Sequence, residues 1–364
     1  MRYIISFTIA LSLLTSHGFA QLSAGASEMT GPLKFEVIHQ VNTTAVKNQG
    51  RTGTCWSFSC SSFLESELIR MGKKGIDLSE MYSVRKTYSD KAENHIRYNG
   101  KSNFSQGSLG HDVLKVYEKH GIVPESAYTG VLNSSEGHNH NKMESKLVKL
   151  IKKIAKVSTL STELLQGLEA VMDTYMGEVP ETFEFEGKTY TPRTFADEVV
   201  GIHPNDYISF TSFTHHPFYR SFVLEVPDNY SNGLFYNLPV NELEEVTDYA
   251  LKNGFSLTWD GDVSNKGFDP KKGVALQNNP VTQKQRQLGF DSQVITDDHL
   301  MHLTGIAKDS LGNEYYITKN SWGQVGPFKG YLYTSKSYFR LNTISILVHR
   351  DAVPPAILAK LKMR

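Results

Sequence analysis

Residues 48–60, with the sequence NQGRTGTCWSFSC, contain both cysteines of this 364-residue chain. Apolar side chains recur at helical spacing along residues 56–71, which predicts a helix that begins at about Cys55. Gly50 and Gly53 come just before it and allow the backbone to turn sharply and to approach a ligand closely. The sequence therefore places a thiol in the first turn of a helix, where the positive end of the helix dipole stabilises a thiolate.

The two cysteines are not expected to form a disulfide with each other. Cα atoms five residues apart on a helix are separated by roughly 8–9 Å, whereas a disulfide requires less than about 7 Å. Cys60 falls on the apolar stripe of the helix, so we expect it in the core. Cys55 is the candidate nucleophile, and a thiol nucleophile needs a base and a group that orients the base.

A candidate base lies in the segment DDHLMHLTGIA, which is followed by YYITKNSWG. These segments predict a strand, a turn and a second strand, and this arrangement can place His299 beside Asn320. The Asn320 carbonyl oxygen can then hold the imidazole in one orientation, and Trp322 can shield the hydrogen bond from water. His302, three residues later, takes an apolar position of the same strand.

Together, these segments resemble the three active-site blocks of papain-family cysteine peptidases. The family has a glutamine six residues before its nucleophile, as Gln49 stands before Cys55, and a histidine six residues before a glycine, as His299 does. The resemblance implies that Cys55 is the nucleophile and His299 the base, with Asn320 orienting the base. It also implies that Gln49 donates to the oxyanion and that thiolate and imidazolium form an ion pair.

Three departures from the usual papain pattern indicate one branch of the family. Thr52 occupies the position of a cysteine that normally forms a disulfide, and the segment between Cys55 and His299 far exceeds the usual separation of about 130–150 residues. The stretch before Gln49 is too short for an inhibitory propeptide. The chain resembles bleomycin hydrolase and the bacterial aminopeptidase C group, whose members share these features and a nucleophile block of the form seen here as CWSFSC.

The resemblance implies a papain-like α+β fold at residues 21–350, with the active-site cleft between a helical lobe and a β-rich lobe. We expect the helical lobe at about 42–250, including a long insertion between the Cys and His blocks. The β-rich lobe is expected at about 251–350, joined by an N-terminal arm at 21–41, and residues 351–364 form a short tail. The patterns predict helices at 55–71, at 108–120 and from Lys142, a hairpin in FEFEGKTYTP, and strands at 255–263, 300–308, 313–319, 330–334 and 344–349.

Further features bear on how a peptide would bind. In the family, two glycines line the non-primed side of the cleft, and this pair corresponds to Gly107 and Ser108, with an ordinary turn before a helix as the alternative. Trp322 is expected to border the same cleft. In bleomycin hydrolases, a C-terminal arm enters the cleft and fixes the amino group of the substrate. The sequence HRDAVPPAILAKLKMR matches the lead-in to that arm and ends at Arg364, so we expect a less blocked cleft with aminopeptidase or endopeptidase action.

Residues 1–20 have the sequence MRYIISFTIALSLLTSHGFA, with Arg2, an apolar run and small residues that end at Ala20. This pattern is typical of a secretory signal peptide cleaved after Ala20, with a buried N-terminal helix as the alternative. The run is too short for a good transmembrane span, so no stable membrane insertion is expected. The mature protein is expected outside the cytoplasm, either in the periplasm or in the extracellular medium.

The charge balance excludes some classes of partner. The chain has 38 basic and 38 acidic residues, which argues against a general nucleic-acid binder or a polybasic membrane protein. Peptide substrates are the expected partners, and the oligomeric state is left open. The helix from Lys142 is basic and amphipathic, so it is either a solvated helix with one core-facing side or a surface that touches membranes or acidic partners.

No cofactor or metal is expected. The segment GHNHN contains His138 and His140, and the segment THHP contains His215 and His216. Neither pair has an evident third and fourth ligand nearby, so polar surface loops explain both segments better than metal sites do.

Two aspartates near the expected cleft have open roles. Asp262 could line the cleft or cap a turn, and Asp298 could tune the pH dependence of the base or simply begin a strand. Two other classes of function also stay open: a catalytically silent papain fold that binds or scaffolds, and a transferase or hydrolase of non-peptide amides. Failure of a thiol-directed epoxide to label Cys55 would support the silent fold, and acyl transfer outrunning hydrolysis would support the transferase.

Overall fold

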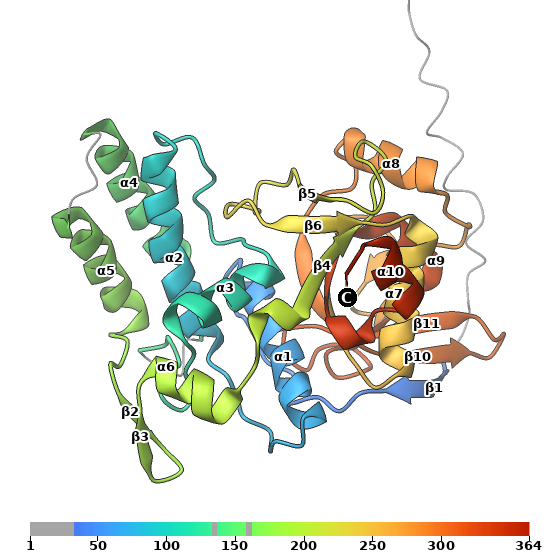
Figure 1. Ribbon diagram of the computed structural model, residues 1–364, viewed down its shortest axis with the longest axis horizontal. Helices are drawn as coiled ribbons and strands as arrows, with labels where there is room; N and C mark the ends of the chain where they lie inside the picture. Colours follow the sequence, from blue (N-terminus) through green and yellow to red (C-terminus); the bar gives the residue numbers. More distant parts are fainter. Residues whose placement is uncertain (1–32, 133–136, 158–161, 364) are drawn as a thin grey trace, which may run out of the picture. The chain divides into compact units, whose positions relative to one another are not determined.

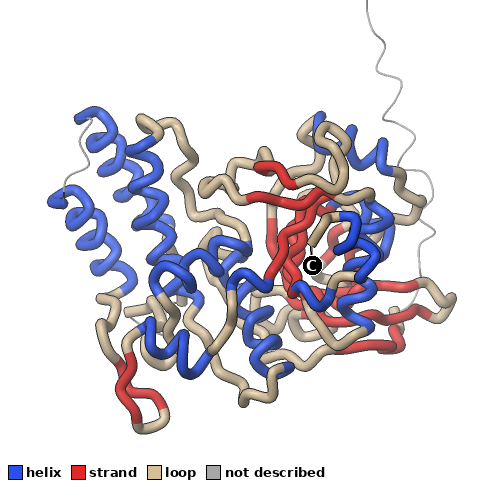
Figure 2. Tube along the Cα trace, in the orientation of Figure 1, coloured by secondary structure: helices blue, strands red, loops and turns tan. Residues whose placement is uncertain are grey.

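Eleven strands form one mixed sheet, most of which comes from the second half of the chain (Figures 1 and 2). The computed structural model describes residues 33–132, 137–157 and 162–363, so the expected signal peptide at residues 1–20 lies outside the described chain. The strand order is β5-β6-β4-β13-β7-β10-β11-β12-β9-β8, and β1 also pairs with β10. The strands are β1 (Phe35–Gln40), β4 (Tyr207–Thr211), β5 (Ser221–Val223), β6 (Leu234–Asn237), β7 (Leu257–Gly261), β8 (Phe268–Asp269), β9 (Val274–Ala275), β10 (His299–Asp309), β11 (Glu314–Lys319), β12 (Tyr331–Ser335) and β13 (Thr343–His349).

The helices gather in two regions. Figure 1 shows α2, α4 and α5 packed side by side at one end of the described unit, and α7, α8, α9 and α10 around the sheet at the other. The α-helices are α1 (Cys55–Arg70), α2 (Glu80–Arg97), α3 (Gly110–His120), α4 (Asn141–Val157), α5 (Thr162–Met176), α6 (Pro192–Phe195), α7 (Val240–Lys252), α8 (Gln283–Asp291), α9 (Lys336–Asn342) and α10 (Pro355–Lys360). Short turns of π-helix (Ala196–Val200) and 3-10 helix (Pro204–Asp206, Arg350–Ala352) and the hairpin of β2 (Phe183–Phe185) and β3 (Lys188–Tyr190) complete the elements.

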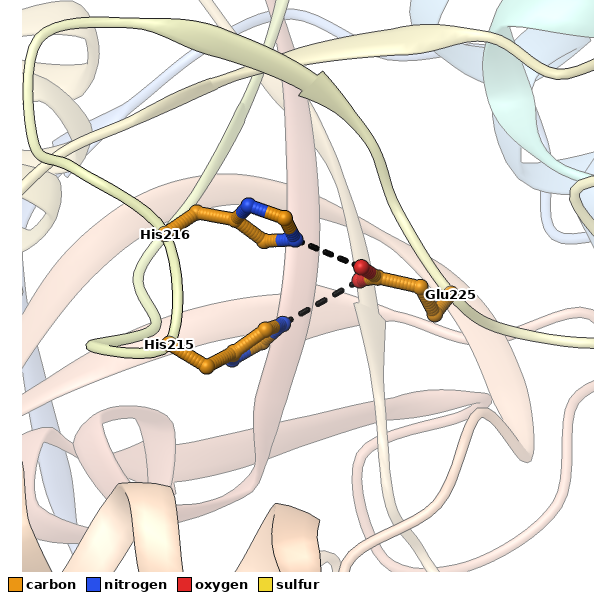
Figure 3. Close-up of side chains that lie close together, drawn as sticks. All are labelled: His215, His216 and Glu225. Carbon is orange, nitrogen blue, oxygen red and sulfur yellow. Dashed lines mark hydrogen bonds and ion pairs between the residues drawn. The ribbon is translucent and has the colours of Figure 1, made fainter.

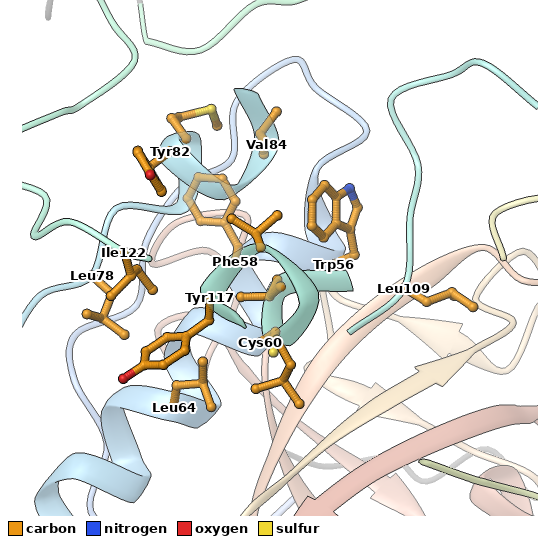
Figure 4. Close-up of a cluster of buried hydrophobic side chains, with 14 of the residues drawn as sticks. Trp56, Phe58, Cys60, Leu64, Leu78, Tyr82, Val84, Leu109, Tyr117 and Ile122 are labelled. Carbon is orange, nitrogen blue, oxygen red and sulfur yellow. The ribbon is translucent and has the colours of Figure 1, made fainter. Parts of the chain in front are cut away.

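Helix α1 is buried along almost its whole length. Every residue from Cys55 to Leu68 is buried, because α2, α3 and β10 all pack against this helix. Figure 4 shows Trp56 and Cys60 among apolar side chains of the neighbouring segments. The Cys60 sulfur is enclosed and lies 3.3 Å from the carbonyl oxygen of Gly110. A helix held in this way fixes the position of its own first turn.

The strands at the centre of the sheet are covered on both faces. Trp259, Met301 and Ile346 belong to one core together with Val246 of α7. Leu300, the neighbour of Met301, belongs instead to the core around α1. Successive side chains of a strand point to opposite faces, so β10 separates the two cores, and runs of apolar residues suit strands that are buried on both sides.

The register of three central strands determines which side chains face α1. In the antiparallel pair of β10 and β7, His299 lies opposite Gly261, and Leu300 lies opposite Asp260. On the other side of β7, Asp260 pairs with Ser345 of β13. Paired residues project from the same face of a sheet, so Asp260 shares the face of Leu300, which packs toward α1.

Most of the elements expected from the sequence are present. The predicted helices are α1, α3 and α4, the predicted hairpin is β2–β3, the five predicted strands are β7, β10, β11, β12 and β13, and the N-terminal arm includes β1. Strands β4 and β6 belong to the same sheet, and helix α7 packs in its core. The lobe boundary at about residue 251 stays a prediction. None of the described helices is long and apolar enough to cross a membrane.

Candidate active site

Cys55 lies at the first position of α1, as the sequence predicts. The turn before the helix depends on Gly50, whose φ of +65° and close approach to the His138 backbone leave no room for a side chain. Cys55 is buried, and only 9% of the residue is exposed. Cys55 and Cys60 are both free, in agreement with the expectation from helix geometry.

His299 and Asn320 lie side by side. His299 begins β10, Asn320 follows the paired strand β11, and His299 Nε2 lies 2.8 Å from Asn320 Oδ1. The same Oδ1 accepts a hydrogen bond of 2.7 Å from the backbone N–H of Ser321, so the Asn320 amide presents its oxygen to the imidazole. His299 therefore carries a proton on Nε2, which leaves Nδ1 able to accept a proton from another group.

Trp322 packs on the imidazole of His299. The two ring centroids are 4.7 Å apart, and the ring planes are inclined by 32°. His299 and Asn320 are each 4% exposed, whereas Trp322 is partly exposed at the surface of the site. A large ring on one face of a buried imidazole keeps water from that face, which strengthens the hydrogen bond to Asn320.

The N-terminal end of α1 lies next to the N-terminal end of β10. The backbone N–H of Leu300, the residue after His299, is a hydrogen-bond donor to the Cys55 sulfur. Helix α1 also packs along β10. The thiol and the imidazole, which are far apart in the sequence, therefore belong to one site, and Asn320 is its third member.

Gln49 is tied into the same site by its side-chain amide. Its Nε2 donates to the carbonyl oxygen of Thr52 at 2.8 Å, and its Oε1 accepts from Ser321 Oγ at 2.6 Å. Within the described chain, the second N–H of the amide has no acceptor, so it can donate to a bound group. Sequence analysis did not single out Ser321, although it stands in the NSWG segment and holds Gln49 in place.

Burial opposes charge on both groups of the candidate pair. It raises the pKa of the Cys55 thiol to about 12 and lowers the pKa of the His299 imidazole to about 4. Asp228, Asp260 and Asp297 add to the effect on the thiol, because a thiolate is repelled by negative charge. Burial therefore opposes the ion pair that the family resemblance implies, whereas the attraction between thiolate and imidazolium favours it. In either form, the pair holds one proton.

This proton count predicts how alkylation of Cys55 depends on pH. Between about pH 5 and pH 9, Cys55 and His299 together hold one proton, and transfer of that proton to His299 produces the thiolate. The rate of alkylation by a neutral reagent should be nearly constant over this range. It should fall as the pH drops through the pKa of His299, at about 4, because the pair then holds two protons.

The measurement is the rate of alkylation from about pH 3 to pH 10, with the adduct located by peptide mapping. A rate that rises about tenfold per pH unit through neutral pH would mean that the Cys55 thiol titrates alone, without help from His299. The Cys60 thiol provides an internal comparison, because it is fully buried and should stay unmodified.

Gly107 and Ser108 differ in what they offer to a ligand. Ser108 is 1% exposed, and its hydroxyl donates to Asp112 Oδ2 at 2.6 Å, so this side chain holds the start of α3 and does not face a ligand. Gly107 is partly exposed, and the Asp228 carboxylate lies directly over it, where a Cβ would collide with it. A main-chain contact from this pair to a peptide stays a prediction, and it would be made beside a carboxylate.

Sequence analysis missed three acidic residues near the thiol. Asp228, Asp260 and Asp297 all act on the charge of Cys55. A signal for Asp260 exists in the segment SLTWDG, where an acidic residue interrupts a run that otherwise reads as a buried strand. Asp228 has no comparable signal, because only the folded chain brings its loop to Gly107.

Asp262 and Asp298 have different surroundings. Asp262 is fully buried, and its carboxylate accepts from the backbone N–H of Ser264 at 3.0 Å and of Thr296 at 2.9 Å. It therefore caps a turn and holds the segment that leads into His299. Asp298 is exposed, and its Oδ1 accepts from Thr296 Oγ1 at 2.7 Å. The turn-capping role of Asp262 is confirmed. Burial lowers the pKa of His299, and the negative charge of Asp298 partly opposes this shift.

His215, His216 and Glu225 form a small cluster at the surface (Figure 3). The Nε2 atoms of the two histidines lie 3.1 and 2.5 Å from the two carboxylate oxygens. The amide oxygen of Gln287 accepts from the backbone N–H of Thr214, so its Nε2 donates to His215 Nδ1 at 3.0 Å. His215 then carries its proton on Nε2 and donates to Glu225, which favours a hydrogen-bonded loop over a metal site.

Unlike His215 and His216, which Glu225 joins as a third possible ligand that the sequence did not reveal, His138 and His140 belong to no such group among the described residues. No third side chain within the described ranges joins them in a group close enough to share an ion. Burial lowers the pKa of both imidazoles to about 4, so both are neutral at physiological pH. His138 packs edge-on against Phe58 of α1, at 5.9 Å between ring centroids, which gives it a packing role.

Comparison with known families matches residues 101–364 to the Peptidase C1-like family, a region that contains His299 and Asn320 and begins after Cys55. Aminopeptidase W from Lactobacillus delbrueckii subsp. lactis is 26% identical over 373 residues, which cover 89% of this chain and 85% of that protein. Aminopeptidase C from Streptococcus thermophilus is 24% identical over 382 residues, which cover 89% and 84% respectively.

A solved structure shares the fold. The crystal structure of PepW from Lactobacillus rhamnosis HN001 matches with a TM-score of 0.75 and 20% identity, and the match covers 91% of this chain and 85% of that one. The predicted α+β fold, with helices and a large mixed sheet, is confirmed. The chain therefore belongs to the Peptidase C1-like family and is a papain-like cysteine-type peptidase of the aminopeptidase C branch.

Proposed function

We propose that this peptidase removes amino-terminal residues from peptides by acyl transfer through the Cys55 thiol. The observation that carries the proposal is the 2.8 Å hydrogen bond between His299 Nε2 and Asn320 Oδ1, beside the first turn of α1. A nucleophile, a base and a group that orients the base are what thiol catalysis needs. The similar proteins named aminopeptidase W and aminopeptidase C favour release from the amino terminus.

In the first half of the reaction, the Cys55 sulfur attacks the carbonyl carbon of the peptide bond while its proton passes to His299 Nδ1. The carbonyl oxygen becomes negative and accepts hydrogen bonds from the Gln49 amide and the Cys55 backbone N–H. Each donor contributes roughly 3–4 kcal/mol to the transition state in comparable sites. His299 gives the proton to the leaving amine as the C–N bond breaks, and an acyl-enzyme remains.

In the second half, His299 takes a proton from water, and the oxygen of that water attacks the thioester carbon. The C–S bond breaks, the carboxylic acid is released, and the proton returns to the Cys55 sulfur. Asn320 holds the Nε2 proton throughout, so in each half of the reaction Nδ1 acts first as base and then as acid. Trp322 keeps water from the hydrogen bond between His299 and Asn320, and the steps require no cofactor.

We also infer that the protein is exported, from Arg2 and the apolar run that ends at Ala20. An oxidising compartment favours disulfides, but Cys55 and Cys60 are both free in one helix, so no internal disulfide competes with catalysis. Amino-terminal sequencing of the mature protein should begin at Gln21. A mature chain that still begins at Met1 would contradict cleavage.

The test of the function uses two fluorogenic substrates with the full chain under mild reductant. Leucyl-aminocoumarin, which has a free amino group, should be hydrolysed, and its N-acetyl analogue should not. Cys55→Ala is the control and should hydrolyse neither. Cleavage of N-blocked peptides would instead establish an endopeptidase. Transfer of the acyl group to an added amine, faster than hydrolysis, would establish a transferase.

If the protein hydrolyses neither substrate and Cys55 resists labelling by a thiol-directed epoxide, the result would contradict catalysis and support the catalytically silent papain fold.

A further inference from the structure

Three aspartates from different elements act on the charge of the candidate nucleophile. Asp260 lies on β7, Asp297 lies two residues before His299, and Asp228 lies in the loop between β5 and β6. Each of the three is close enough to Cys55 to oppose a negative charge on its sulfur. The reactive form of a catalytic thiol is the thiolate anion. Negative carboxyl groups destabilise this anion, so they do not activate the free thiol.

Asp260 and Asp297 have carboxyl oxygens that no donor reaches within the described chain. Asp260 is 1% exposed, and its Oδ2 accepts from Ser345 Oγ at 3.1 Å, but its Oδ1 is buried without a donor. Asp297 is partly exposed, and its buried Oδ2 is also unpaired. Buried polar atoms without partners are costly. These oxygens therefore need either a proton shared between the two carboxyl groups or a donor from outside the chain.

Asp228 lies at the side of the site that Gly107 borders. Its Oδ1 accepts from Asn103 Nδ2 at 2.8 Å and from Ser105 Oγ at 3.4 Å. Its Oδ2 lies over Gly107, and no donor to this oxygen is found among the described residues. Asp228 is partly exposed, so this oxygen can receive a hydrogen bond from a ligand.

Positive charge near the three aspartates is scarce. The largest charge effects on Asp260 and Asp297 come from other aspartates, and Lys91 also interacts with Asp297. Lys91 acts on Asp228, but its ammonium group donates to the carbonyl oxygens of Ser105 and Gly107. The site therefore keeps an excess of carboxyl groups and suits a cationic ligand.

We propose that the carboxyl groups of Asp228, Asp260 and Asp297 form the subsite that receives the α-ammonium group of the substrate. The inference rests on the proposed aminopeptidase function and names the residues that recognise the free amino terminus. In an aminoacyl group, the nitrogen lies about 2.5 Å from the carbonyl carbon, so the groups that bind it must lie beside the atom that Cys55 attacks.

Asp260 lies opposite Leu300, the residue after His299, in the pair of β7 and β10. Asp297 lies two residues before His299, and the Asp228 carboxylate lies over Gly107. These positions place the three carboxyl groups around the start of β10, where the base of the site lies.

A shared proton is the other way to satisfy the unpaired oxygens. One proton between Asp260 and Asp297 would join the two carboxyl groups, and burial raises the pKa of Asp260 to about 7 and that of Asp297 well above its usual range. A shared proton suits the empty site. An incoming ammonium group supplies both charge and donors, so it replaces the proton, which leaves to solvent.

The same arrangement couples recognition of the amine to activation of the nucleophile. In the empty site, burial and then the three aspartates raise the pKa of the Cys55 thiol. An ammonium group between the aspartates cancels part of their negative field and so favours the thiolate. A blocked amino terminus brings no positive charge and leaves the carboxyl groups facing a neutral amide. Free amines are therefore favoured both in binding and in the chemical step.

The test compares leucyl-aminocoumarin with its N-acetyl analogue in the full chain and in the variants Asp297→Asn and Asp228→Asn. Each variant keeps the size of the side chain and removes one charge. For the free amine, kcat/KM should fall at least about tenfold, the effect of losing one charge-assisted hydrogen bond, while kcat/KM for the N-acetyl analogue should not fall. Asp351→Asn removes one exposed carboxylate that does not act on the three aspartates or on Cys55, and the ratio of the two rates should stay unchanged in this control.

The outcomes are distinct. An equal fall for both substrates in Asp297→Asn and Asp228→Asn, in variants that unfold at the wild-type temperature, would overturn the proposal. A fall in kcat/KM confined to N-acetylated dipeptide substrates whose first residue is lysine would also overturn the proposal. The acidic site would then bind a basic side chain and not the amino terminus.

A binding measurement separates the subsite from the reaction. In the Cys55→Ala protein, calorimetry should show that leucinamide binds and that N-acetyl-leucinamide binds at least about tenfold more weakly. Adding Asp297→Asn should abolish this preference. If the preference is present but the wild-type protein turns over neither substrate, the subsite stands and the proposed function fails. If turnover occurs but the preference is absent, the proposed function stands and the subsite fails.

Discussion

Replacing Cys55 with alanine is expected to lower kcat/KM for an aminoacyl amide by roughly 10,000-fold or more, because no acyl-enzyme can form. Cys55 is the first residue of α1 and receives a hydrogen bond from the backbone N–H of Leu300, the residue after His299. Alanine is a strong helix former, and the change removes a single sulfur atom, so α1 should keep its place. The loss should therefore appear in kcat and not in the temperature of thermal unfolding.

Cys60→Ala is the matched control for this change. Cys60 lies on the same helix, is fully buried, and has its sulfur 3.3 Å from the carbonyl oxygen of Gly110. Removing this sulfur leaves a small cavity, so we expect a loss of about 1–2 kcal/mol in the free energy of unfolding and peptidase activity close to that of the wild type. Equal losses of activity in the two variants, or full activity in Cys55→Ala, would contradict the assignment of the nucleophile.

Replacing His299 with glutamine is expected to lower kcat/KM by a similar factor, roughly 10,000-fold or more. Glutamine has no group that can take the proton of Cys55 and give it to the leaving amine. His299 Nε2 is hydrogen-bonded to Asn320, so Nδ1 is the nitrogen that is free to transfer protons. The substitution removes this nitrogen from the site. The rate of alkylation of Cys55 at neutral pH should fall together with kcat/KM, because both depend on transfer of the same proton.

His302→Gln is the matched control for the second prediction. His302 lies three residues further along β10, is fully buried, and has its Nδ1 2.9 Å from Ser62 Oγ. Ser62 also accepts a hydrogen bond of 2.7 Å from Lys319. His302 thus belongs to a buried polar network behind the site, and its replacement should lower the unfolding temperature but change kcat/KM by less than about tenfold. Equal losses of alkylation rate in the two variants would contradict the role of His299.

The sequence predicts the pair of His299 and Asn320 well, because the pair depends on local features. A strand, a short turn and a second strand bring the two residues together, and β10 and β11 have this arrangement. The position of Cys55 is predicted for a similar reason, since a glycine-rich turn followed by helical spacing marks the start of α1. Local patterns also predict β7, β12 and β13.

The acidic residues of the site could not be predicted in the same way. Asp260 faces α1 because of the register between β7 and β10, and register is a long-range property that no single segment reveals. Asp228 reaches Gly107 from a loop that is distant in the sequence. The spacing of residues within one segment carries no information about such encounters.

The extent of the sheet was also beyond the local patterns. Strands β4 and β6 are short, and they are recognisable as part of the sheet only through their pairing with β13 and with each other.

Helix α2 was not among the predicted helices. It buries Arg85 and Lys91 among its core-facing residues. Long polar side chains at buried positions obscure the apolar stripe by which helices are recognised.

The most direct measurement of the central claim is the site of covalent labelling by a thiol-directed epoxide, read by intact mass and peptide mapping of the full chain. The account predicts one adduct, located on Cys55, with peptidase activity lost in proportion to labelling and with labelling abolished in His299→Gln. An adduct on Cys60, or full activity in a chain labelled at Cys55, would contradict the claim that the Cys55 thiol, activated by His299, is the nucleophile.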